Sequence, residues 1–342
     1  MNSIHKYLLI IISFTLFACA TDEPEKVIVP QPVKQEVIPE KVIVPTPDFN
    51  ADSAYAFIQN QVDFGPRVPM TASHDSCGKW LIDKLQSYGF EMIIQEGVAK
   101  AWTGDLLDMT NIMGQFNPEA VERIVLFAHW DTRPYADKDS TRKYEPIDGA
   151  NDGGSGVGVL LEIARQVSIL SPGYGVDIVF FDAEDYGTFQ ADMYQDLQQM
   201  KHDWCLGSQY WALNLPVKNY KPRYGILLDM VGAPDAKFPK ESVSLRYAKT
   251  HVNNLWNKAA ELGYGDKFVK NMAGGITDDH VYINSIAKIK TLDIIDMRPS
   301  TDGNYYGFGS FHHTHGDNMD VIDKGTLKAV GQTVLAAIYE QI

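Results

Sequence analysis

Ionisable side chains follow three apolar runs of this sequence, at the point where each run ends. Residues 123–128 lead into His129 and Asp131, residues 176–181 lead into Asp182, Glu184 and Asp185, and residues 224–228 lead into Asp229. In open α/β sheets, pockets lie outside the carboxyl ends of the strands. One acid after a strand is usually a helix N-cap, but three such positions favour a single polar site at a shared sheet edge.

Two loops add more residues of the types that bind metals. Asp152 lies in the glycine-rich segment 149–156, and His312, His313 and His315 lie in the segment 311–318. Neutral imidazoles and carboxylates are common zinc donors, and a catalytic zinc keeps one position open beside its protein ligands. The rival interpretation of 149–156 is a phosphate cradle, but the segment lacks the Gly-Lys-Ser/Thr ending and the Gly-x-Gly-x-x-Gly string after a strand.

The residues between these positions alternate between helix and strand patterns. Apolar residues recur at helical spacing at 54–62 and 77–85, and Gly89 is placed to end the second helix. We predict strands at 123–129, 177–182, 224–230 and 290–295, and helices at 156–170, 208–215, 252–262 and 326–342. Nearly all-apolar strands between helices predict a three-layer αβα sandwich with a central mixed, mostly parallel β-sheet. No break divides residues 49–342, which we expect to form one catalytic domain.

Composition excludes several classes of protein. The chain has 342 residues, 45% apolar residues and a net charge of −14, so it can bury a large core and is not attracted to nucleic acid. Its three cysteines, Cys19, Cys77 and Cys205, are too few for a disulfide scaffold or a multi-cysteine zinc module. Any metal must therefore be held mainly by His, Asp and Glu. Whether Cys77 and Cys205 form a disulfide is left open.

The first 48 residues are expected to lie outside the folded domain. Residues 1–19 have a positive start and an apolar run that is too short to span a bilayer, and they end in Leu-Phe-Ala-Cys. This ending resembles a bacterial lipobox, which predicts cleavage before Cys19 and lipidation of Cys19; a plain signal peptide is the alternative. Residues 20–48 are rich in proline and predict an extended tether, with a docked β-arm as the alternative. We expect an exported cell-envelope lipoprotein, attached on the periplasmic side or to the outer membrane.

The ordered strand-end motifs carry a family resemblance. The series His129-Trp-Asp131, Ala150-Asn-Asp152, Phe181-Asp-Ala-Glu184-Asp185, Leu228-Asp229-Met and His313-Thr-His-Gly-Asp317 resembles the co-catalytic zinc aminopeptidase superfamily. Within it, the chain is most similar to the animal-type (type II) glutaminyl cyclases, which form N-terminal pyroglutamate. Four strings carry that similarity: Gly65-Pro-Arg67, Leu227 to Pro234, Asp278-Asp279-His280, and Phe308 five residues before His313.

The resemblance implies a role for each matching residue. It places one zinc ion on Asp152, Asp185 and His313, makes Glu184 the general acid/base, and pairs Asp229 with Asp278 beside it. The implied substrate pocket is lined by His129, Ile276, Phe308 and Trp204. The implied substrates are peptides or proteins with N-terminal glutamine, and we expect a monomer.

The sequence also departs from the family pattern. Asp185 stands where the family has the longer Glu, and His312 stands where it has Trp. The tryptophan expected shortly after the Asp185 position is missing, and residues 186–206 form an enlarged loop in which Phe189 or Trp204 could substitute for it.

Three alternatives remain open on the sequence. A di-zinc aminopeptidase would use His129, Asp152 and Asp229 for a second metal, and all five ligand positions of that class are filled. Asp229 and Asp278 could instead be a structural hydrogen-bonded couple. A non-catalytic surface protein with a structural metal is the third, but an open zinc position beside Glu184 argues against it.

Overall fold

A computed structural model describes residues 44–189, 202–303 and 305–342. The predicted signal peptide, Cys19, most of the predicted tether and residues 190–201 of the enlarged loop lie outside the described residues. Residues 44–342 belong to one compact unit, and its contacts begin before Phe49, since Gln332 Nε2 donates a hydrogen bond to the carbonyl of Pro47. Among the described residues, no helix combines the length and apolar character needed to cross a membrane.

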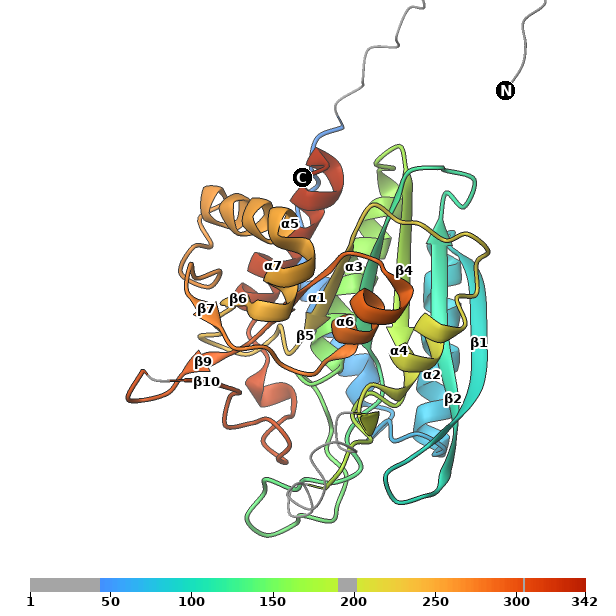
Figure 1. Ribbon diagram of the computed structural model, residues 1–342, viewed down its shortest axis with the longest axis vertical. Coiled ribbons are helices and arrows are strands. Elements are labelled where there is room, and N and C mark those ends of the chain that lie inside the picture. The colour runs from blue at the N-terminus through green and yellow to red at the C-terminus, as the bar shows by residue number, and fades with distance from the viewer. Residues whose placement is uncertain (1–43, 190–201, 304) are drawn as a thin grey trace, which may run out of the picture. The chain divides into compact units, whose positions relative to one another are not determined.

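A mixed six-stranded sheet forms the middle layer of this unit (Figure 1), in the order β1-β2-β4-β3-β5-β8. Strands β4, β3, β5 and β8 run parallel, while β1 and β2 are antiparallel additions at one edge. The bounds are β1 (Glu91–Lys100), β2 (Leu106–Phe116), β3 (Arg123–His129), β4 (Gly175–Phe181), β5 (Gly225–Asp229) and β8 (Thr291–Ile295). Two small ribbons pair β6 (Lys240–Glu241) with β7 (Met272–Ala273), and β9 (Arg298–Pro299) with β10 (Tyr306–Gly307).

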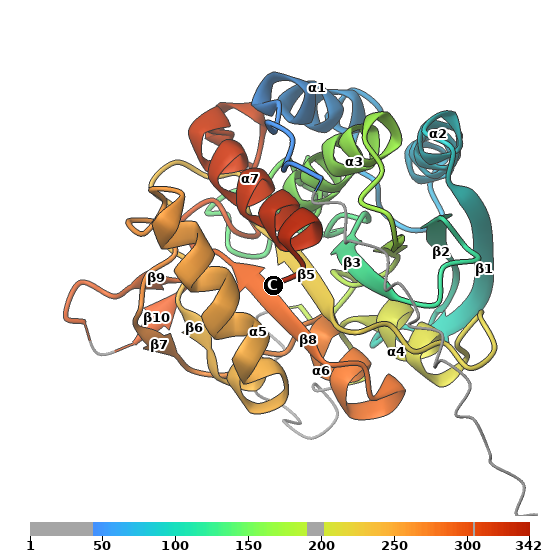
Figure 2. The ribbon, with the colours of Figure 1, turned by 90° about the horizontal axis from the view of Figure 1, so that it is seen from above.

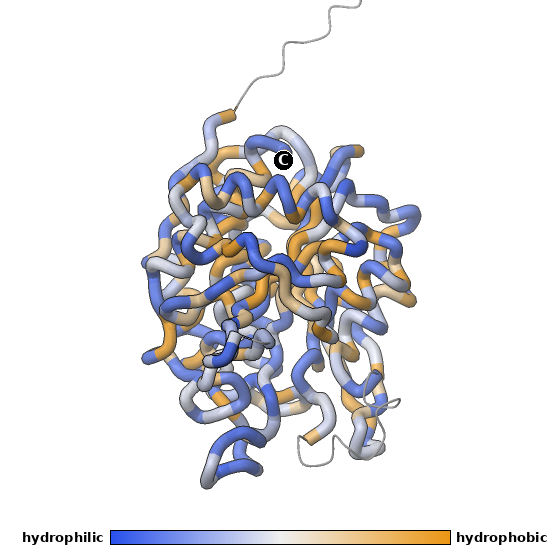
Figure 3. The backbone as a smooth tube through the Cα atoms, turned by 60° about the vertical axis from the view of Figure 1, so that its left-hand side comes forward, coloured by the Kyte–Doolittle hydropathy of each residue, from blue (hydrophilic) through white to orange (hydrophobic). Residues whose placement is uncertain are grey.

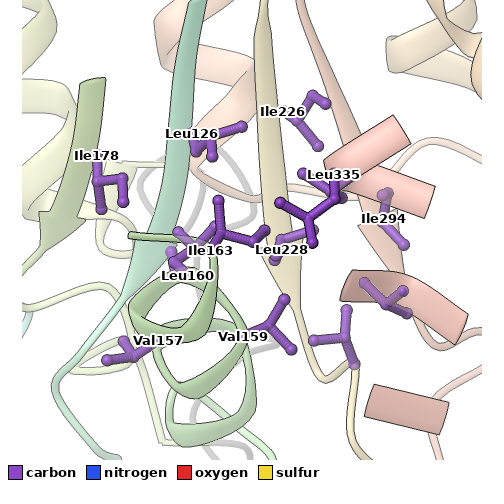
Figure 4. Close-up of a cluster of buried hydrophobic side chains, with 14 of the residues drawn as sticks. Leu126, Val157, Val159, Leu160, Ile163, Ile178, Ile226, Leu228, Ile294 and Leu335 are labelled. Carbon is purple, nitrogen blue, oxygen red and sulfur yellow. The ribbon is translucent and has the colours of Figure 1, made fainter. Parts of the chain in front are cut away.

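Helices cover both faces of the sheet, as the sequence predicts (Figure 2). They are α1 (Ala51–Val62), α2 (Ala72–Ser87), α3 (Gly154–Ile169), α4 (Leu206–Leu213), α5 (Ser242–Glu261), α6 (Asp279–Tyr282) with the π-helical η3 (Ile283–Ala287), the 3-10 helix η4 (Met319–Val321) and α7 (Lys324–Glu340). Leu126 and Ile226 point toward α3 and α7 (Figure 4), whereas Val125 and Phe127 pack with Trp211 of α4. Successive strand residues point to opposite faces, so a buried parallel strand must be apolar throughout. The three-layer prediction is confirmed.

The sequence patterns missed β1 and β2. β1 is an edge strand whose residues are half-buried or exposed, and β2 mixes polar and apolar residues. Their stability comes from pairing with each other and with β4, which is a long-range contact rather than a local preference. The predicted strand at 123–129 has the same bounds as β3. The hydropathy colouring shows apolar segments gathered in the interior (Figure 3). The helix predicted at 252–262 begins earlier, at Ser242, because Glu241 caps it by accepting hydrogen bonds from the backbone of Val243 and Ser244.

Candidate active site

Asp152, Asp185 and His313 converge just beyond the carboxyl ends of β3, β4 and β5. His313 Nε2 lies 3.1 Å from Asp185 Oδ1 and 3.8 Å from Asp152 Oδ2, and all three side chains are buried. Asp185 Oδ2 is buried and has no hydrogen-bond partner among the described residues. Burial, together with the charge of Asp152, raises the pKa of Asp185. This donor set, with an unpartnered carboxylate oxygen, fits a zinc ion.

Other buried side chains hold these three in place. Asp317 accepts hydrogen bonds from the backbone amides of Asn151 and Asp152, at 2.7 and 3.0 Å. Asp137 Oδ1 lies 3.4 Å from His313 Nδ1, so a carboxylate faces the ring nitrogen opposite the one near Asp185. Such outer partners fix the orientation of a ligating imidazole and increase its basicity.

Arg133 connects the loop that carries Asp185 to Asp137, the carboxylate beside His313. Its buried guanidinium donates two hydrogen bonds to Asp137 and further ones to the backbone oxygens of Asp185, Gly187 and Thr188. It also lies 4.6 Å from the centre of the Trp204 ring. One residue therefore fixes both the loop that carries Asp185 and the carboxylate behind His313. Sequence patterns did not reveal this role, because Asp185, Gly187 and Thr188 lie more than 50 residues from Arg133 in the chain.

The adjacent acids Glu184 and Asp185 point in different directions. Both of their backbone amides donate to the carboxylate of Asp131, each at 3.1 Å. Asp185 turns toward His313, whereas Glu184 Oε1 accepts a hydrogen bond from the thiol of Cys205 at 3.1 Å. The preceding residue, Ala183, has a φ of 51°, a left-handed conformation that costs about 1–2 kcal/mol outside glycine. Strained backbone of this kind is concentrated at functional sites, and Met230 and His313 share it.

Glu184 lies in a cluster of carboxyl groups. Ligand atoms of Glu184, Cys205 and Asp278 all lie within 4.8 Å of one another. Burial raises the pKa of Glu184 well above its usual range, and the charges of Asp185, Asp279 and Asp278 add to the effect. Burial, reinforced by the nearby charges of Asp152 and Asp278, raises the pKa of Asp229 to about 7. The two acids of the predicted pair, Asp229 and Asp278, are thus electrostatically coupled.

Asp278 has a structural role as well. Its Oδ1 accepts a hydrogen bond from the backbone amide of Asp279 at 2.5 Å and caps α6, while its Oδ2 is buried without a partner among the described residues. The N-cap interpretation and the site interpretation therefore both apply to this residue. A ligand atom of Asp293 also lies within 4.8 Å of one of Asp278, so the two carboxyl groups share this buried region.

His129 bridges two carboxylates. Its Nε2 lies 3.1 Å from Asp152 Oδ1 and 3.3 Å from Asp229 Oδ1. Burial opposes a charge on the ring, but hydrogen bonds with Asp131, Asp152 and Asp229 outweigh it and raise the pKa of His129 well above the usual range. The structure thus brings together the residues predicted for a second metal, and a protonated His129 can neutralise the same carboxylates.

Aromatic side chains border the centre, and two of the four predicted pocket residues, Trp204 and Phe308, are among them. Trp204 lies parallel to the His313 ring, with centroids 5.8 Å apart, so its ring lies beside the candidate centre. Phe308 is 37% exposed and packs on His312, which in turn stacks on His313. Lys138 Nζ contacts His312 Nδ1. Phe189 is the second candidate for the tryptophan position, but it stacks on Tyr144 instead.

Glycines of the segment 149–156 allow the backbone to pack closely where a side chain would not fit. A Cβ on Gly153, whose φ is 84°, would lie 2.8 Å from the Asp131 carbonyl oxygen and 3.0 Å from His129 Cε1. A Cβ on Gly156 would lie 2.3 Å from the carbonyl oxygen of Leu228. Arg67 of the Gly-Pro-Arg string holds the same loop, since its guanidinium donates to the carbonyls of Trp130, Asp148 and Gly149. These contacts bring Asp152 next to His129.

Cys77 and Cys205 are free and buried, so the disulfide left open on the sequence is not formed. Cys77 lies in α2, whereas Cys205 contacts Glu184. Burial, followed by the charge of Glu184, raises the pKa of Cys205 well above its usual range. Cys205 is therefore a neutral hydrogen-bond donor to Glu184, a role that the sequence did not reveal.

Comparison with known proteins places this geometry in a family. The model described as Peptidase family M28 matches residues 111–338. Aminopeptidase YwaD of Bacillus subtilis (strain 168) is 26% identical over an alignment of 243 residues, and the match covers 68% of this chain and 44% of that protein. The chain therefore spans less than half the length of this relative.

Two solved structures are similar over almost their whole length. A Zn-dependent exopeptidase from Parabacteroides distasonis ATCC 8503 is 52% identical, with a TM-score of 0.81, and the match covers 86% of this chain and 99% of that one. The Bacteroides thetaiotaomicron glutaminyl cyclase bound to N-acetylhistamine is 50% identical, with a TM-score of 0.82 and the same coverage.

Proposed function

The chain belongs to peptidase family M28, and we propose that it is a glutaminyl-peptide cyclotransferase. It would convert N-terminal glutamine of peptides and proteins into pyroglutamate and release ammonia. The observation that carries the proposal is the position of Glu184. It is held beside the Asp185–His313 centre but faces Asp278, which belongs to neither set of predicted metal ligands. The Bacteroides thetaiotaomicron glutaminyl cyclase, which is 50% identical and is matched over 99% of its length, supports the same activity.

The side chains divide the reaction between them. Cyclisation joins the α-amine nitrogen of glutamine to its own γ-carbonyl carbon and expels ammonia. The chemistry that bound zinc supplies is polarisation of that carbonyl. Glu184 takes a proton from the amine and returns it to the departing nitrogen, which requires a carboxyl pKa above that of a free side chain. Burial of Glu184 raises its pKa in that direction. Asp229 and Asp278 orient the amine by accepting its hydrogen bonds.

We expect one zinc ion per chain, bound by Asp152, Asp185 and His313. His129 already lies within hydrogen-bond reach of Asp152 and Asp229, and as a cation it can balance their charges in place of a second metal. Metal analysis of the purified protein after dialysis, together with the zinc dependence of its melting temperature, measures the count. Two zinc ions at full occupancy would contradict this expectation and favour a di-zinc aminopeptidase.

The aminopeptidase is the second candidate, because the residues for a second metal lie together and because two relatives carry exopeptidase or aminopeptidase names. The deciding experiment incubates the protein with a Gln-initiated peptide and a matched Leu-initiated peptide and follows both by mass spectrometry. Loss of ammonia from the first peptide alone supports the cyclase. Removal of the first residue from either peptide supports the aminopeptidase, and no change in either one supports a non-catalytic surface protein.

We also propose that the protein works in the cell envelope, held by a lipid on Cys19. This rests on the lipobox-like ending of residues 1–19. The intact mass of membrane-extracted protein should show a chain that begins at Cys19 and carries a diacylglyceryl group. Cys19→Ala should abolish both the cleavage and the lipid. A mature chain of unmodified mass would leave a plain signal peptide as the explanation.

A further inference from the structure

Cys205 stands at the N-cap of α4, but its side chain does not cap that helix. Its backbone is left-handed (φ 58°, ψ 37°), which is uncommon outside glycine, and its side chain makes no capping hydrogen bond. N-caps usually carry Ser, Thr, Asp or Asn, whose side-chain oxygens accept hydrogen bonds from the first turn. Neither helix capping nor backbone preference therefore explains a cysteine at this position.

Backbone hydrogen bonds fix Cys205 beside the turn that carries Glu184. The amide of Cys205 donates to the carbonyl of Glu184 at 2.9 Å. A second bond joins the residues next to them, from the amide of Leu206 to the carbonyl of Ala183 at 3.1 Å. Both Ala183 and Cys205 have a left-handed backbone, with φ of 51° and 58°. The start of α4 and the turn at Glu184 are thus held together, and the thiol has a fixed place in that arrangement.

The thiol donates a hydrogen bond to the side chain of Glu184. Cys205 Sγ lies 3.1 Å from Glu184 Oε1, and Cys205 is fully buried. Burial raises the pKa of Cys205 well above its usual range, so the thiol keeps its proton. Among the described residues, no other side chain donates a hydrogen bond to Glu184.

The orientation of Glu184 depends on its surroundings. The side chain is half-buried, and the last torsion of a glutamate is broadly distributed, so contacts must select one orientation of the carboxylate. Asp185, Asp278 and Asp279 are close enough to interact with it electrostatically. Ionised carboxylates are acceptors only and cannot hold another carboxylate oxygen. The thiol of Cys205 is the neighbour that can.

We propose that Cys205 is a positioning residue for the reaction, whose thiol holds the carboxylate of Glu184 in the orientation that reaches the substrate amine. This inference rests on the proposed function, in which Glu184 is the base. Misplacing a reacting group by about 1 Å can lower a rate about 10²-fold. One hydrogen bond to the base is therefore enough to affect turnover.

The test compares variants of the full-length, zinc-loaded enzyme on a Gln-initiated peptide. Cys205→Ala and Cys205→Gly remove the donor, and each should lower kcat by roughly 10–100-fold. KM should change little, because the contact acts on the chemical step. Cys205→Ser keeps a donor at the same place and should recover most of the lost turnover.

Controls separate this role from a loss of stability. Glycine suits the left-handed backbone of residue 205 and is accepted at N-caps, so Cys205→Gly should keep its fold, its melting temperature and its zinc. The matched control is Cys77→Ala, which removes an equally buried free thiol from α2 and should leave kcat unchanged.

A double-mutant cycle tests whether Cys205 acts through Glu184. In a Glu184→Gln background, Cys205→Ala should cause no further fall in kcat, because the group that the thiol positions no longer serves as a base. Two independent defects would instead add.

The outcomes distinguish the two proposals. If the wild type cyclises no glutamine peptide, the proposed function fails and this inference fails with it. If the wild type is active and folded Cys205→Gly has the same kcat, the function stands and the role of Cys205 is overturned. The same holds if Cys205→Ser loses as much turnover as Cys205→Ala, or if Cys205→Ala costs as much in Glu184→Gln as in the wild type.

Discussion

Glu184→Gln should lower turnover of a Gln-initiated peptide by roughly 10²–10⁴-fold, the usual contribution of a general base. The substitution keeps the size of the side chain and its hydrogen bonding. It also keeps the hydrogen bond that the backbone amide of residue 184 donates to Asp131. What it removes is the ability to accept the proton of the amine. Zinc content and melting temperature should stay close to those of the wild type, since Glu184 faces Cys205 and Asp278 rather than His313.

The pH dependence provides a second readout. Burial raises the pKa of Glu184, so the wild-type rate should fall on the acid side as this carboxylate takes up a proton. The residual activity of Glu184→Gln should not show this fall in rate at acidic pH. If the variant instead loses zinc while turnover per bound zinc is normal, Glu184 is a ligand and not the base.

Asp185→Ala should fail in a different way, by losing the metal. Removing an outer partner of a metal site usually weakens metal binding by roughly 10–100-fold, and removing a charged ligand should cost more than that. Asp185 lies 3.1 Å from His313 and has a buried oxygen without a described partner, so its replacement removes a carboxylate from the centre of the site. Because the defect is in affinity, part of the activity should return when excess zinc is supplied.

Asp137→Asn is the matched comparison for this variant. Asp137 stands behind His313 at 3.4 Å and is not one of the proposed ligands. The zinc affinity of Asp137→Asn, measured by competition with a chelator, should fall less than the zinc affinity of Asp185→Ala. Normal zinc content in Asp185→Ala, with loss in Glu184→Gln, would show that the base and the ligand have been exchanged.

The sequence alone was sufficient to predict the central parallel strands and the sheet edge at which the polar residues meet. Buried parallel strands must be apolar throughout, so the runs that end at His129, Asp182 and Asp229 were visible without any long-range information. Parallel strands also share their direction, so acids that follow different strands had to meet at one edge. The grouping of Asp152, Asp185 and His313 in particular was predicted by the family resemblance of the ordered motifs.

The tertiary structure alone decided what surrounds that centre. Arg133 joins the Asp185 loop to Asp137, Cys205 donates to Glu184, Trp204 lies against His313, and β1 pairs with β2. A strand or helix reveals itself through the period of its own residues, because the backbone geometry repeats locally. A single polar or aromatic contact between loops has no such period. Its partners are chosen by packing between segments far apart in the chain, so no local pattern could identify them.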